Sequence, residues 1–429
     1  PPRSTLFPYT TLFRSKRNND LMKILIYGLN FYPEMIGIGK YTGELAAWLV
    51  NQGNEVRVVT APPYYPQWKV QTGYKSWRHQ RESWMGVDVF RCPLWVPQKP
   101  SGIKRILHLL SFSISSFPTM VSQIRWKPEI VLNIVPTLFS SGCSILTARI
   151  SNAKSWLHIQ DFELDAANSL GMLQTGNFIS RIASKWEKQL LSRFDIVSTI
   201  SNRMISHLIA KGVAREKTVL FPNWIDTKTV FPINQAHNPY REELSITPNQ
   251  IVVLYSGNMG NKQGLEIILE VAQEMLADVN VIFLLCGNGT ARPELEKNAR
   301  LLSNIHFLDL QPSEKLNQLL NSANIHLLPQ QANAADLVMP SKLLGMLASG
   351  KPVIATANEY TELADVIQQI GIVVPPDNRE AIIGAIKILE KSPDLCKELG
   401  HRSRQFVCSH WDKEHVLTKF QEIIKTITS

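Results

Sequence analysis

Short apolar runs alternate with amphipathic segments along most of this chain. The first series of runs is rich in Val, Ile and Leu, which is typical of strands that are buried on both faces. These runs span residues 23–29, 55–61, 87–92, 130–135, 154–161, 195–201 and 218–222. The segments between them have helical periodicity, as in residues 40–53, where Leu45, Trp48 and Leu49 share a face. Repeated units of this kind predict a parallel, doubly wound sheet.

A second series of the same kind follows a polar stretch at residues 231–249. Its predicted strands span residues 251–257, 281–287, 305–310, 325–330, 352–357 and 371–376. The sequence therefore predicts an α/β protein of two doubly wound, Rossmann-like domains, residues 22–230 and 231–405, that face each other across a cleft. The last segment, residues 406–429, is predicted to be an amphipathic helix that crosses back to the N-terminal domain.

Composition limits the class of protein. An apolar content of 44% and a charged content of 19% describe a globular chain. The five cysteines are scattered and lack CxxC spacing, which favours a reducing cytoplasm and argues against disulfides or a zinc site. No apolar stretch reaches the ~20 residues that a membrane span requires. The run MKILIYGL at residues 22–29 is interpreted as a first strand rather than a signal peptide.

The N-terminal tail is set apart from the fold prediction. Residues 5–15, TLFPYTTLFRS, look like the translation of a sequencing-adapter oligonucleotide, so residues 1–21 are interpreted as an artefact and Met22 as the start. The tail carries four basic residues and one acidic residue, so the net charge of +9 falls to +6 for residues 22–429. This mild charge, without a recognition motif, argues against a nucleic-acid partner.

Two predicted loops contain residues that suit an anion. In GLNFYPEMIGIGKYTGEL, Gly37 and Gly39 precede a helix, and amides at a helix start can face a phosphate. The spacing is not that of a dinucleotide fingerprint, which disfavours NAD; a flexible loop is the alternative. In YSGNMGNKQG, a strand ends at Gly257 and Lys262 follows in the turn, where it can point into the cleft. A solvated surface lysine would have the same pattern.

The stretch DLVMPSKLLGMLASGKPVIA, residues 336–355, predicts a helix that starts near Pro340 and a buried strand after it. The first amides of this helix and Lys342 form a positive helix start, worth roughly 0.3–1 kcal/mol per anionic contact and up to ~2 when partly buried. Two anion-suited sites in one domain, at Lys262 and at Ser341-Lys342, are more specific than either alone.

Together these motifs resemble a known family. PEMIGIGKYTGELA, PNWID, SGNMGNKQG, LLCGNG and PSKLLGMLASGKPVIA are similar to motifs of the retaining GT-B glycosyltransferases of the glycogen-synthase-like superfamily. More narrowly, PPYYPQWKV, PLWVPQKPSGIKRILHL and LHIQDFELDAA resemble the colanic-acid fucosyltransferase branch. The resemblance covers residues 22–429. It implies a GDP- or UDP-linked sugar donor on the C-terminal domain and an acceptor on the N-terminal domain.

The resemblance also implies roles for residues in the donor loops. Lys262 matches the lysine with which the family binds the diphosphate, and Asn258 stands where the family usually has an arginine. Gly257 and Gly287 end the two strands whose loops are expected to hold the donor. A tight structural turn is the alternative for the loop after Gly287.

Further donor residues are implied around residues 336–355. Ser341 and Lys342 match the helix start beneath the phosphates, and Leu310 matches the edge segment that receives the base. Gly345 stands where the family has the glutamate that binds the ribose. Asp336 lies near the position of the family's first acid, and a helix cap is its alternative role.

The catalytic prediction rests on Asp161 and Lys262. The family's His-Asp pair appears here as Gln160-Asp161; a helix cap is the alternative for Asp161, and His158 is predicted to be a packed strand histidine. Positive groups at the leaving diphosphate are expected to supply most of the catalysis. Because no clear DxD motif occurs, we expect neither a metal nor another cofactor. The resemblance implies retention of configuration, with the departing phosphate helping to deprotonate the acceptor.

Two stretches suggest contact with a membrane surface. Residues 62–84 interleave aromatic and cationic side chains, and residues 101–118 are strongly apolar between basic residues. An ordered loop and a helix packed on the sheet are the alternatives. With an acceptor linked to polyprenyl diphosphate, we expect a cytoplasmic enzyme peripheral at the inner membrane. A nucleotide-sugar epimerase and a non-catalytic nucleotide-sugar-binding subunit are the competing functions.

Overall fold

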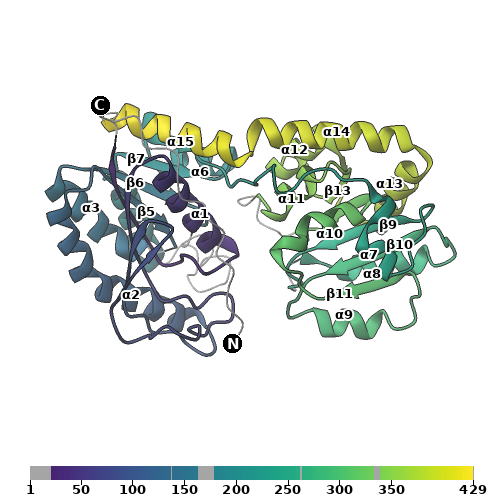
Figure 1. Cartoon of the computed structure of the whole chain (residues 1–429), viewed down its shortest axis with the longest axis horizontal. Coiled ribbons are helices and arrows are strands. Elements are labelled where there is room, and N and C mark those ends of the chain that lie inside the picture. Colours follow the sequence, from purple (N-terminus) through teal and green to yellow (C-terminus); the bar gives the residue numbers. More distant parts are fainter. Residues whose placement is uncertain (1–20, 137, 163–177, 261–262, 333–338, 429) are drawn as a thin grey trace, which may run out of the picture.

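The computed structural model of the chain contains two α/β domains that lie side by side (Figure 1). Each domain is built around one central sheet, with eight strands in the N-terminal domain and six in the C-terminal domain. The structure describes residues 21–136, 138–162, 178–260, 263–332 and 339–428.

The N-terminal sheet has the strand order β3-β4-β2-β1-β5-β6-β7-β8, and its neighbours are parallel except for β3 and β4. Each predicted apolar run forms a strand, shorter by a residue or more where the flanking residues enter loops. The strands are β1 (Lys23–Gly28), β2 (Glu55–Thr60), β3 (Gln80–Trp84), β4 (Val87–Arg91), β5 (Ile130–Val135), β6 (Lys154–Ile159), β7 (Ile196–Thr199) and β8 (Thr218–Leu220).

Strand β3 differs from the sequence prediction, which placed no strand within residues 62–84. Met85 and Gly86, both with positive φ, form the turn that returns β3 antiparallel to β4. The side chain of Arg81 donates two hydrogen bonds to Asp88 across this hairpin, at 3.1 and 2.7 Å. The strand is held by its partner strand, because its own sequence, QRESW, has no apolar run.

Helices cover both faces of the N-terminal sheet. On one face α1 buries Leu45, Trp48 and Leu49 against β1, β2 and β5. On the other face α2 buries Phe112 and Met120. The helices of this domain are α1 (Gly37–Asn51), α2 (Gly102–Gln123), α3 (Ser141–Ser151), α5 (Phe178–Leu191) and α6 (Asn202–Ala210).

The C-terminal sheet is wholly parallel, with the order β11-β10-β9-β12-β13-β14. This is the Rossmann order. The first three strands are added toward one edge of the sheet and the last three toward the other, so the order switches between β9 and β12. The strands are β9 (Ile251–Ser256), β10 (Val281–Cys286), β11 (Ile305–Leu308), β12 (Ile325–Leu328), β13 (Val353–Thr356) and β14 (Ile372–Val374). The helices are α7 (Pro239–Glu243), α8 (Glu266–Glu274), α9 (Arg292–Asn298), α10 (Leu316–Ser322), α11 (Lys342–Ala348), α12 (Glu362–Ile370) and α13 (Arg379–Lys391).

Two helices at the end of the chain run along both domains, drawn in yellow in Figure 1. Helix α14 (Pro393–His410) buries Val407 in the C-terminal core. Helix α15 (Lys413–Thr428) buries Leu417, Phe420 and Ile424 in the N-terminal core, where Phe420 stacks on Phe221. The crossing therefore lies between His410 and Lys413, a few residues after the predicted boundary at 405.

A second connection between the domains joins α6 to α12. The carboxylate of Glu362 accepts hydrogen bonds from the backbone amides of Asn202 and Arg203, at 2.9 and 2.8 Å. The guanidinium of Arg203 in turn contacts the carbonyl of Tyr360 and the carboxylate of Asp365. A carboxylate at a helix N-terminus is favourable, so the C-terminal domain caps a helix of the N-terminal domain.

Candidate active site

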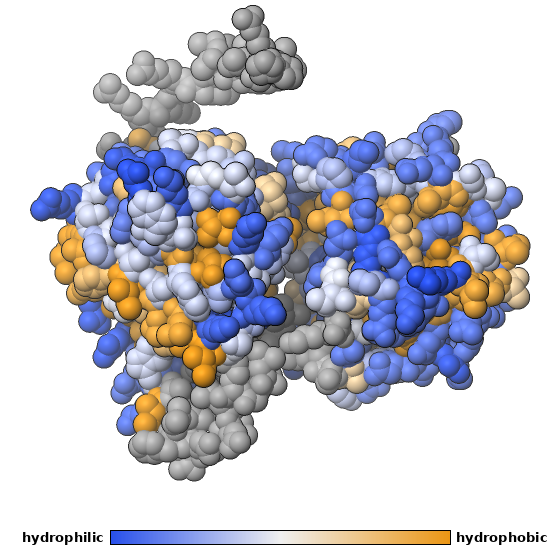
Figure 2. Space-filling view, turned by 90° about the horizontal axis from the view of Figure 1, so that it is seen from below, coloured by the Kyte–Doolittle hydropathy of each residue, from blue (hydrophilic) through white to orange (hydrophobic). Residues whose placement is uncertain are grey.

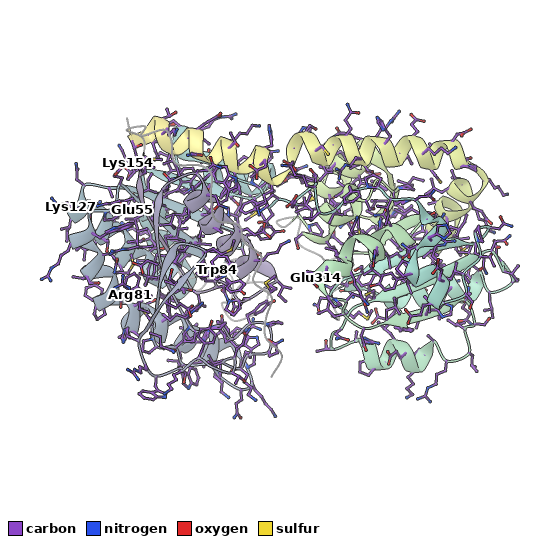
Figure 3. All side chains as sticks on the ribbon, viewed as in Figure 1. Glu55, Arg81, Trp84, Lys127, Lys154 and Glu314 are labelled. Carbon is purple, nitrogen blue, oxygen red and sulfur yellow. The ribbon has the colours of Figure 1, made fainter. Side chains whose placement is uncertain are left out.

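Each sheet has one point where ligands of doubly wound proteins bind. In the C-terminal domain it lies between β9 and β12, and in the N-terminal domain between β1 and β5. The sequence predicted anion-suited residues in the loops that follow three of these strands, β1, β9 and β12. Trp84 and Glu314 lie on the sides of the two domains that face each other (Figure 3).

The predicted donor loops after β9 and β10 cross each other at van der Waals distance. The amide of Gly257 donates to the carbonyl of Cys286 at 2.9 Å, and the amide of Met259 donates to the carbonyl of Asn288 at 2.9 Å. A Cβ on Gly287, which has φ +143°, would lie 1.9 Å from the carbonyl oxygen of Gly257. Only glycine fits at position 287, because any side chain would clash with the carbonyl of Gly257. The two glycines therefore let the loops after β9 and β10 lie in direct contact.

Lys342 reaches from α11 over the end of β9. Its ammonium group donates a hydrogen bond to the hydroxyl of Tyr255 at 3.0 Å and lies 4.4 Å from the centre of the Tyr255 ring. The same hydroxyl donates to the carbonyl of Asn258 at 2.6 Å. Burial lowers the pKa of Lys342 to about 8. A desolvated cation beside the Gly257 backbone is suited to bind an anionic ligand.

Helix α11 starts at Lys342, two residues after the start near Pro340 that the sequence predicted. Ser341 is exposed at the cap position and makes no side-chain hydrogen bond to the helix, so the side chain caps none of its first amides. Gly345, one turn further, is buried, and a Cβ there would point to Leu320 of α10 at 3.1 Å. A glutamate at this position would meet Leu320, so here the position serves helix packing.

Leu310, predicted to lie beneath the base, is exposed just after β11. Beside it, Arg292 donates to the carbonyl of Gly287 at 2.8 Å and to the carboxylate of Asp309 at 2.5 Å. Arg292 therefore fixes the loops after β10 and β11 to one another. It was not predicted from the sequence; its place at the start of α9, directly after the CGNGTA loop, is the signal that could have found it.

Two predicted residues, Lys262 and Asp336, lie outside the described residues. The roles assigned to them stay predictions. Within the part of the chain that the structure describes, no group of three or more His, Cys, Asp or Glu side chains is placed to hold a metal ion.

The loop after β1 is organised by a buried carboxylate that was not predicted from the sequence. Glu34 accepts hydrogen bonds from the amides of Tyr64 and Tyr65, both at 2.8 Å, and from the Asn30 side chain at 2.8 Å. Burial raises the pKa of Glu34. A Cβ on Gly39 would lie 2.7 Å from Cβ of Glu34. The second glycine of the predicted motif thus makes room for this carboxylate.

Gly37 has φ +60° and is the first residue of α1. The residue before it, Ile36, caps the helix with no side-chain hydrogen bond. Helix α1 therefore begins three residues before the predicted start at residue 40, and Gly37 and Gly39 lie in its first turn instead of preceding it. The role of its first amides in binding a phosphate stays a prediction.

Arg91 is a second buried charge behind the same loop. Its guanidinium donates to the carbonyl of Ala61 at 2.9 Å and to the carboxylate of Glu82 at 2.7 Å, and it contacts the carbonyl of Tyr32. It joins β3 and β4 to the loops after β1 and β2. The apolar neighbours of Arg91 in VDVFRC were the signal that its position is buried.

Asp161 follows β6 and is exposed at this edge of the N-terminal sheet. The surrounding protein partly desolvates its carboxylate and raises its pKa to about 6. Its negative charge contributes to the raised pKa of Tyr65, which places the two groups near each other. Arg105 opposes this effect on Tyr65. Asp161 and Arg105 therefore both lie near Tyr65, whose amide is bound by the Glu34 carboxylate.

His158 is buried in β6, as predicted for a packed strand histidine. Its Nδ1 lies 2.9 Å from the hydroxyl of Ser198, and its ring meets Phe221 edge to face. Burial lowers the pKa of His158 to about 3, so the ring is neutral at physiological pH. It belongs to the buried core of the N-terminal domain.

Comparison with known proteins fits this geometry. Residues 37–224 match the family described as Glycosyl transferase 4-like domain, and residues 250–391 match Glycosyl transferases group 1. The chain is 43% identical over 410 residues to the colanic acid biosynthesis glycosyl transferase WcaI of Escherichia coli (strain K12), with 93% of this chain and 98% of WcaI covered. The chain belongs to the glycosyltransferases.

Solved structures have the same two-domain GT-B fold as this glycosyltransferase. Sucrose-phosphate synthase from Thermosynechococcus elongatus superposes with a TM-score of 0.72 at 17% identity, covering 94% of this chain and 98% of the synthase. Anabaena HepE, solved in complex with UDP, superposes with a TM-score of 0.67 at 14% identity, covering 94% of this chain and 100% of HepE. At these identities the likeness shows the fold alone.

The glycosyltransferase also has a cavity of about 220 Å³ between its domains. Its mostly apolar lining comes from the β8 end (Val219–Phe221), from α14 and α15, and from Met339 and Leu344 of the C-terminal domain. Lys342, Gly257 and Asp161 do not line it, but Ser341, which the sequence predicted to bind the donor, does. The cavity therefore lies between the two domains and extends to the start of α11.

Proposed function

We propose that this glycosyltransferase moves a sugar from a nucleotide-sugar to a polyprenyl-diphosphate-linked saccharide during the biosynthesis of a colanic-acid-like exopolysaccharide. The relationship to WcaI, which extends over 98% of that protein, is the observation that supports this role most strongly. We assign fucose from GDP-fucose as the donor. That assignment is supported by the resemblance of the N-terminal motifs to the fucosyltransferase branch. The UDP and UDP-glucose complexes of HepE support a nucleotide-sugar as the donor class.

The proposed reaction breaks the bond between C1 of the sugar and the diphosphate oxygen. The acceptor hydroxyl forms the new bond to C1 on the same face, so the configuration is retained, and its proton passes to the departing diphosphate. Charge develops on the diphosphate, where fixed positive groups contribute most to the rate. In this scheme Lys342, the start of α11 and Lys262 hold the diphosphate, and Asp161 contacts the acceptor or the sugar.

The decisive experiment offers the purified enzyme a panel of radiolabelled nucleotide-sugars with lipid-linked acceptors. Label from GDP-fucose is expected in the lipid, with the configuration at C1 unchanged by NMR. Transfer from UDP-sugars alone would refute the donor assignment. Conversion of the nucleotide-sugar without acceptor would favour an epimerase. A purified protein that binds the nucleotide but transfers no label to any acceptor would instead be a non-catalytic binding subunit. Unchanged transfer by Lys262→Ala would remove Lys262 from the proposed mechanism.

Association with the cytoplasmic face of the inner membrane is part of the same proposal. None of the described helices is long and apolar enough to cross a bilayer. The proposed acceptor lies in the membrane, so the enzyme would have to reach it from the surface. Binding to the surface can be measured apart from catalysis, with vesicles that contain no acceptor.

A further inference from the structure

Helix α2 has two apolar faces, of which the N-terminal domain covers only one. His108, Phe112, Ser116 and Met120 are buried against the sheet. They follow one another at intervals of four residues, which is the spacing of one side of a helix. The hydroxyl of Ser116 lies 2.6 Å from that of Tyr27 on β1, which ties this side of α2 to the sheet.

The opposite side of α2 is exposed and also apolar. At about 100° per residue, its members fall within an arc of roughly 100° that points away from the sheet. They are Ile103, Ile106, Leu107, Ile114, Phe117 and Val121, with exposed fractions between 38% and 74%. This set is named the outer stripe. Figure 2 shows hydrophobic residues gathered on the surface of the N-terminal domain when the molecule is seen from below.

A continuous row of this kind is unusual on a protein surface. Single exposed apolar residues are common, but contiguous patches mark sites of interaction with proteins or membranes. Helix α2 has 22 residues, so the outer stripe extends over about 30 Å at 1.5 Å per residue. The sheet does not need these side chains, because the buried side of α2 already covers it.

The charged residues of α2 and of the segments directly before and after it in the sequence have one sign, although the carboxylate of Glu55 on β2 accepts a hydrogen bond from Trp126 near the C-terminal end of α2. Residues 89–128 contain no acidic residue. Their exposed cations are Lys99, Lys104, Arg105, Arg125 and Lys127. They flank both ends of α2, and Lys127 lies at the outer edge of the domain (Figure 3). Exposed Trp77 and Trp95 lie in the neighbouring segments. A surface that combines apolar, aromatic and cationic side chains in this way is suited to the interface of an anionic bilayer.

We infer that α2 lies flat on an anionic lipid bilayer and inserts its outer stripe between the headgroups. This deepens the membrane association proposed above by naming the surface that makes it. The orientation also suits the site. Arg105, in the first turn of α2, lies 5.6 Å from the ring of Trp68 and acts electrostatically on Tyr65, so Tyr65 and the neighbouring Asp161 lie close to the proposed membrane-facing surface. A second copy of the chain is the competing occupant of the stripe.

The test is flotation of the full chain with vesicles of phosphatidylcholine, with and without phosphatidylglycerol. The double variant Ile114→Glu/Phe117→Glu changes two solvent-facing side chains of the stripe. The matched control is Ile388→Glu, an exposed isoleucine on α13 of the other domain. A milder variant, Ile114→Ala/Phe117→Ala, replaces the double glutamate if that one does not fold, as judged by circular dichroism.

The wild type and Ile388→Glu are expected to float with the anionic vesicles at low salt and to dissociate at high salt. The double variant is expected to lose binding by about tenfold or more, because two charges enter the apolar interface. Unchanged flotation of the double variant overturns the inference. So does a wild-type dimer, detected by light scattering and lost in the variant, without vesicle binding.

Transfer to a detergent-solubilised acceptor separates this inference from the proposed function. If the outer stripe serves membrane binding alone, the double variant keeps its rate in detergent and loses it on vesicles. A wild type that floats but transfers no sugar would refute the proposed reaction and leave the membrane surface standing.

Discussion

The ammonium group of Lys342 donates a hydrogen bond to the hydroxyl of Tyr255 at 3.0 Å, which joins the start of α11 to the end of β9. The two residues come from segments that are far apart in the sequence and meet at the switch point of the C-terminal sheet. This contact holds the lysine over the loop that contains Gly257 and Asn258, where the diphosphate of the donor is proposed to bind.

The first prediction concerns nucleotide affinity and pH. Burial lowers the pKa of Lys342 to about 8, so the free enzyme loses this positive charge above that pH. A bound diphosphate favours the charged form, so the affinity for GDP or UDP is expected to fall above about pH 8, by at most about tenfold per pH unit. Titration calorimetry from about pH 7 to about pH 9.5 measures this slope.

Two variants of Lys342 provide the controls. Lys342→Arg keeps its charge throughout this range and is expected to show a flat profile. Lys342→Met is expected to bind GDP or UDP more weakly than the wild type at neutral pH, and its affinity is expected not to change with pH in this range. The role of Lys342 in binding would be disproved by wild-type affinity in Lys342→Met.

A second prediction concerns the acidic limb of the rate. The pKa of Asp161 is raised to about 6 by desolvation, so its carboxylate is protonated and neutral below that pH. If the negative charge contacts the acceptor or the sugar, kcat/KM falls as the pH decreases through about 6. Asp161→Asn is expected to remove this limb and to lower the rate by about 10²–10³. The pH dependence of kcat/KM, measured for the wild type and for Asp161→Asn, tests this prediction. If the fall below about pH 6 persists in Asp161→Asn, another ionisable group causes it.

Most of the fold could be predicted from the sequence, because its strands are continuous apolar runs. Residues such as Ile24, Leu132 and Val253 are buried whatever their neighbours do, and the repeated units specify the parallel topology. Strand β3 could not be predicted in this way. Its residues are polar, and it exists because β4 supplies the backbone hydrogen bonds and the partner for Arg81.

The candidate site was predictable where its chemistry follows from a loop position. Gly257, Gly287 and Lys342 lie at the ends of strands or at a helix start, and the structure brings them together. Glu34 and Arg91 were missed because charged residues are usually exposed. Their burial depends on partners from distant segments, such as the amide of Tyr65 and the carbonyl of Ala61, which no local pattern reveals.

A third prediction concerns the Glu34 loop. In Glu34→Ala the amides of Tyr64 and Tyr65 lose their acceptor, and each unsatisfied buried group costs about 1–3 kcal/mol. Glu34→Gln keeps one oxygen for both amides and is expected to be milder. Gly39→Ala is expected to resemble Glu34→Ala, because its Cβ would lie 2.7 Å from Cβ of Glu34.

Thermal unfolding and the KM for the acceptor test these three variants. The melting temperature should fall and the acceptor KM should rise in Glu34→Ala and Gly39→Ala, with nucleotide affinity unchanged because the donor loops lie on the other domain. Wild-type stability in Gly39→Ala would show that the loop can relax around the added methyl group, and that close approach to Glu34 does not require glycine at this position.

The last prediction separates the two domains through the C-terminal helix. Phe420 on α15 stacks on Phe221 at 4.6 Å and packs against Trp156 at 4.8 Å, inside the N-terminal core. Phe420→Ala is expected to cost about 3–5 kcal/mol of unfolding free energy, because it leaves a cavity in that core. Urea unfolding followed by tryptophan fluorescence measures the loss, with Glu422→Ala, an exposed residue of the same helix, as the control.

GDP or UDP should still bind Phe420→Ala in urea that unfolds its N-terminal domain, because the C-terminal core does not contain this ring. If nucleotide binding were lost at the same urea concentration at which the N-terminal domain unfolds, the two domains would unfold as one unit, and the donor domain would depend on α15.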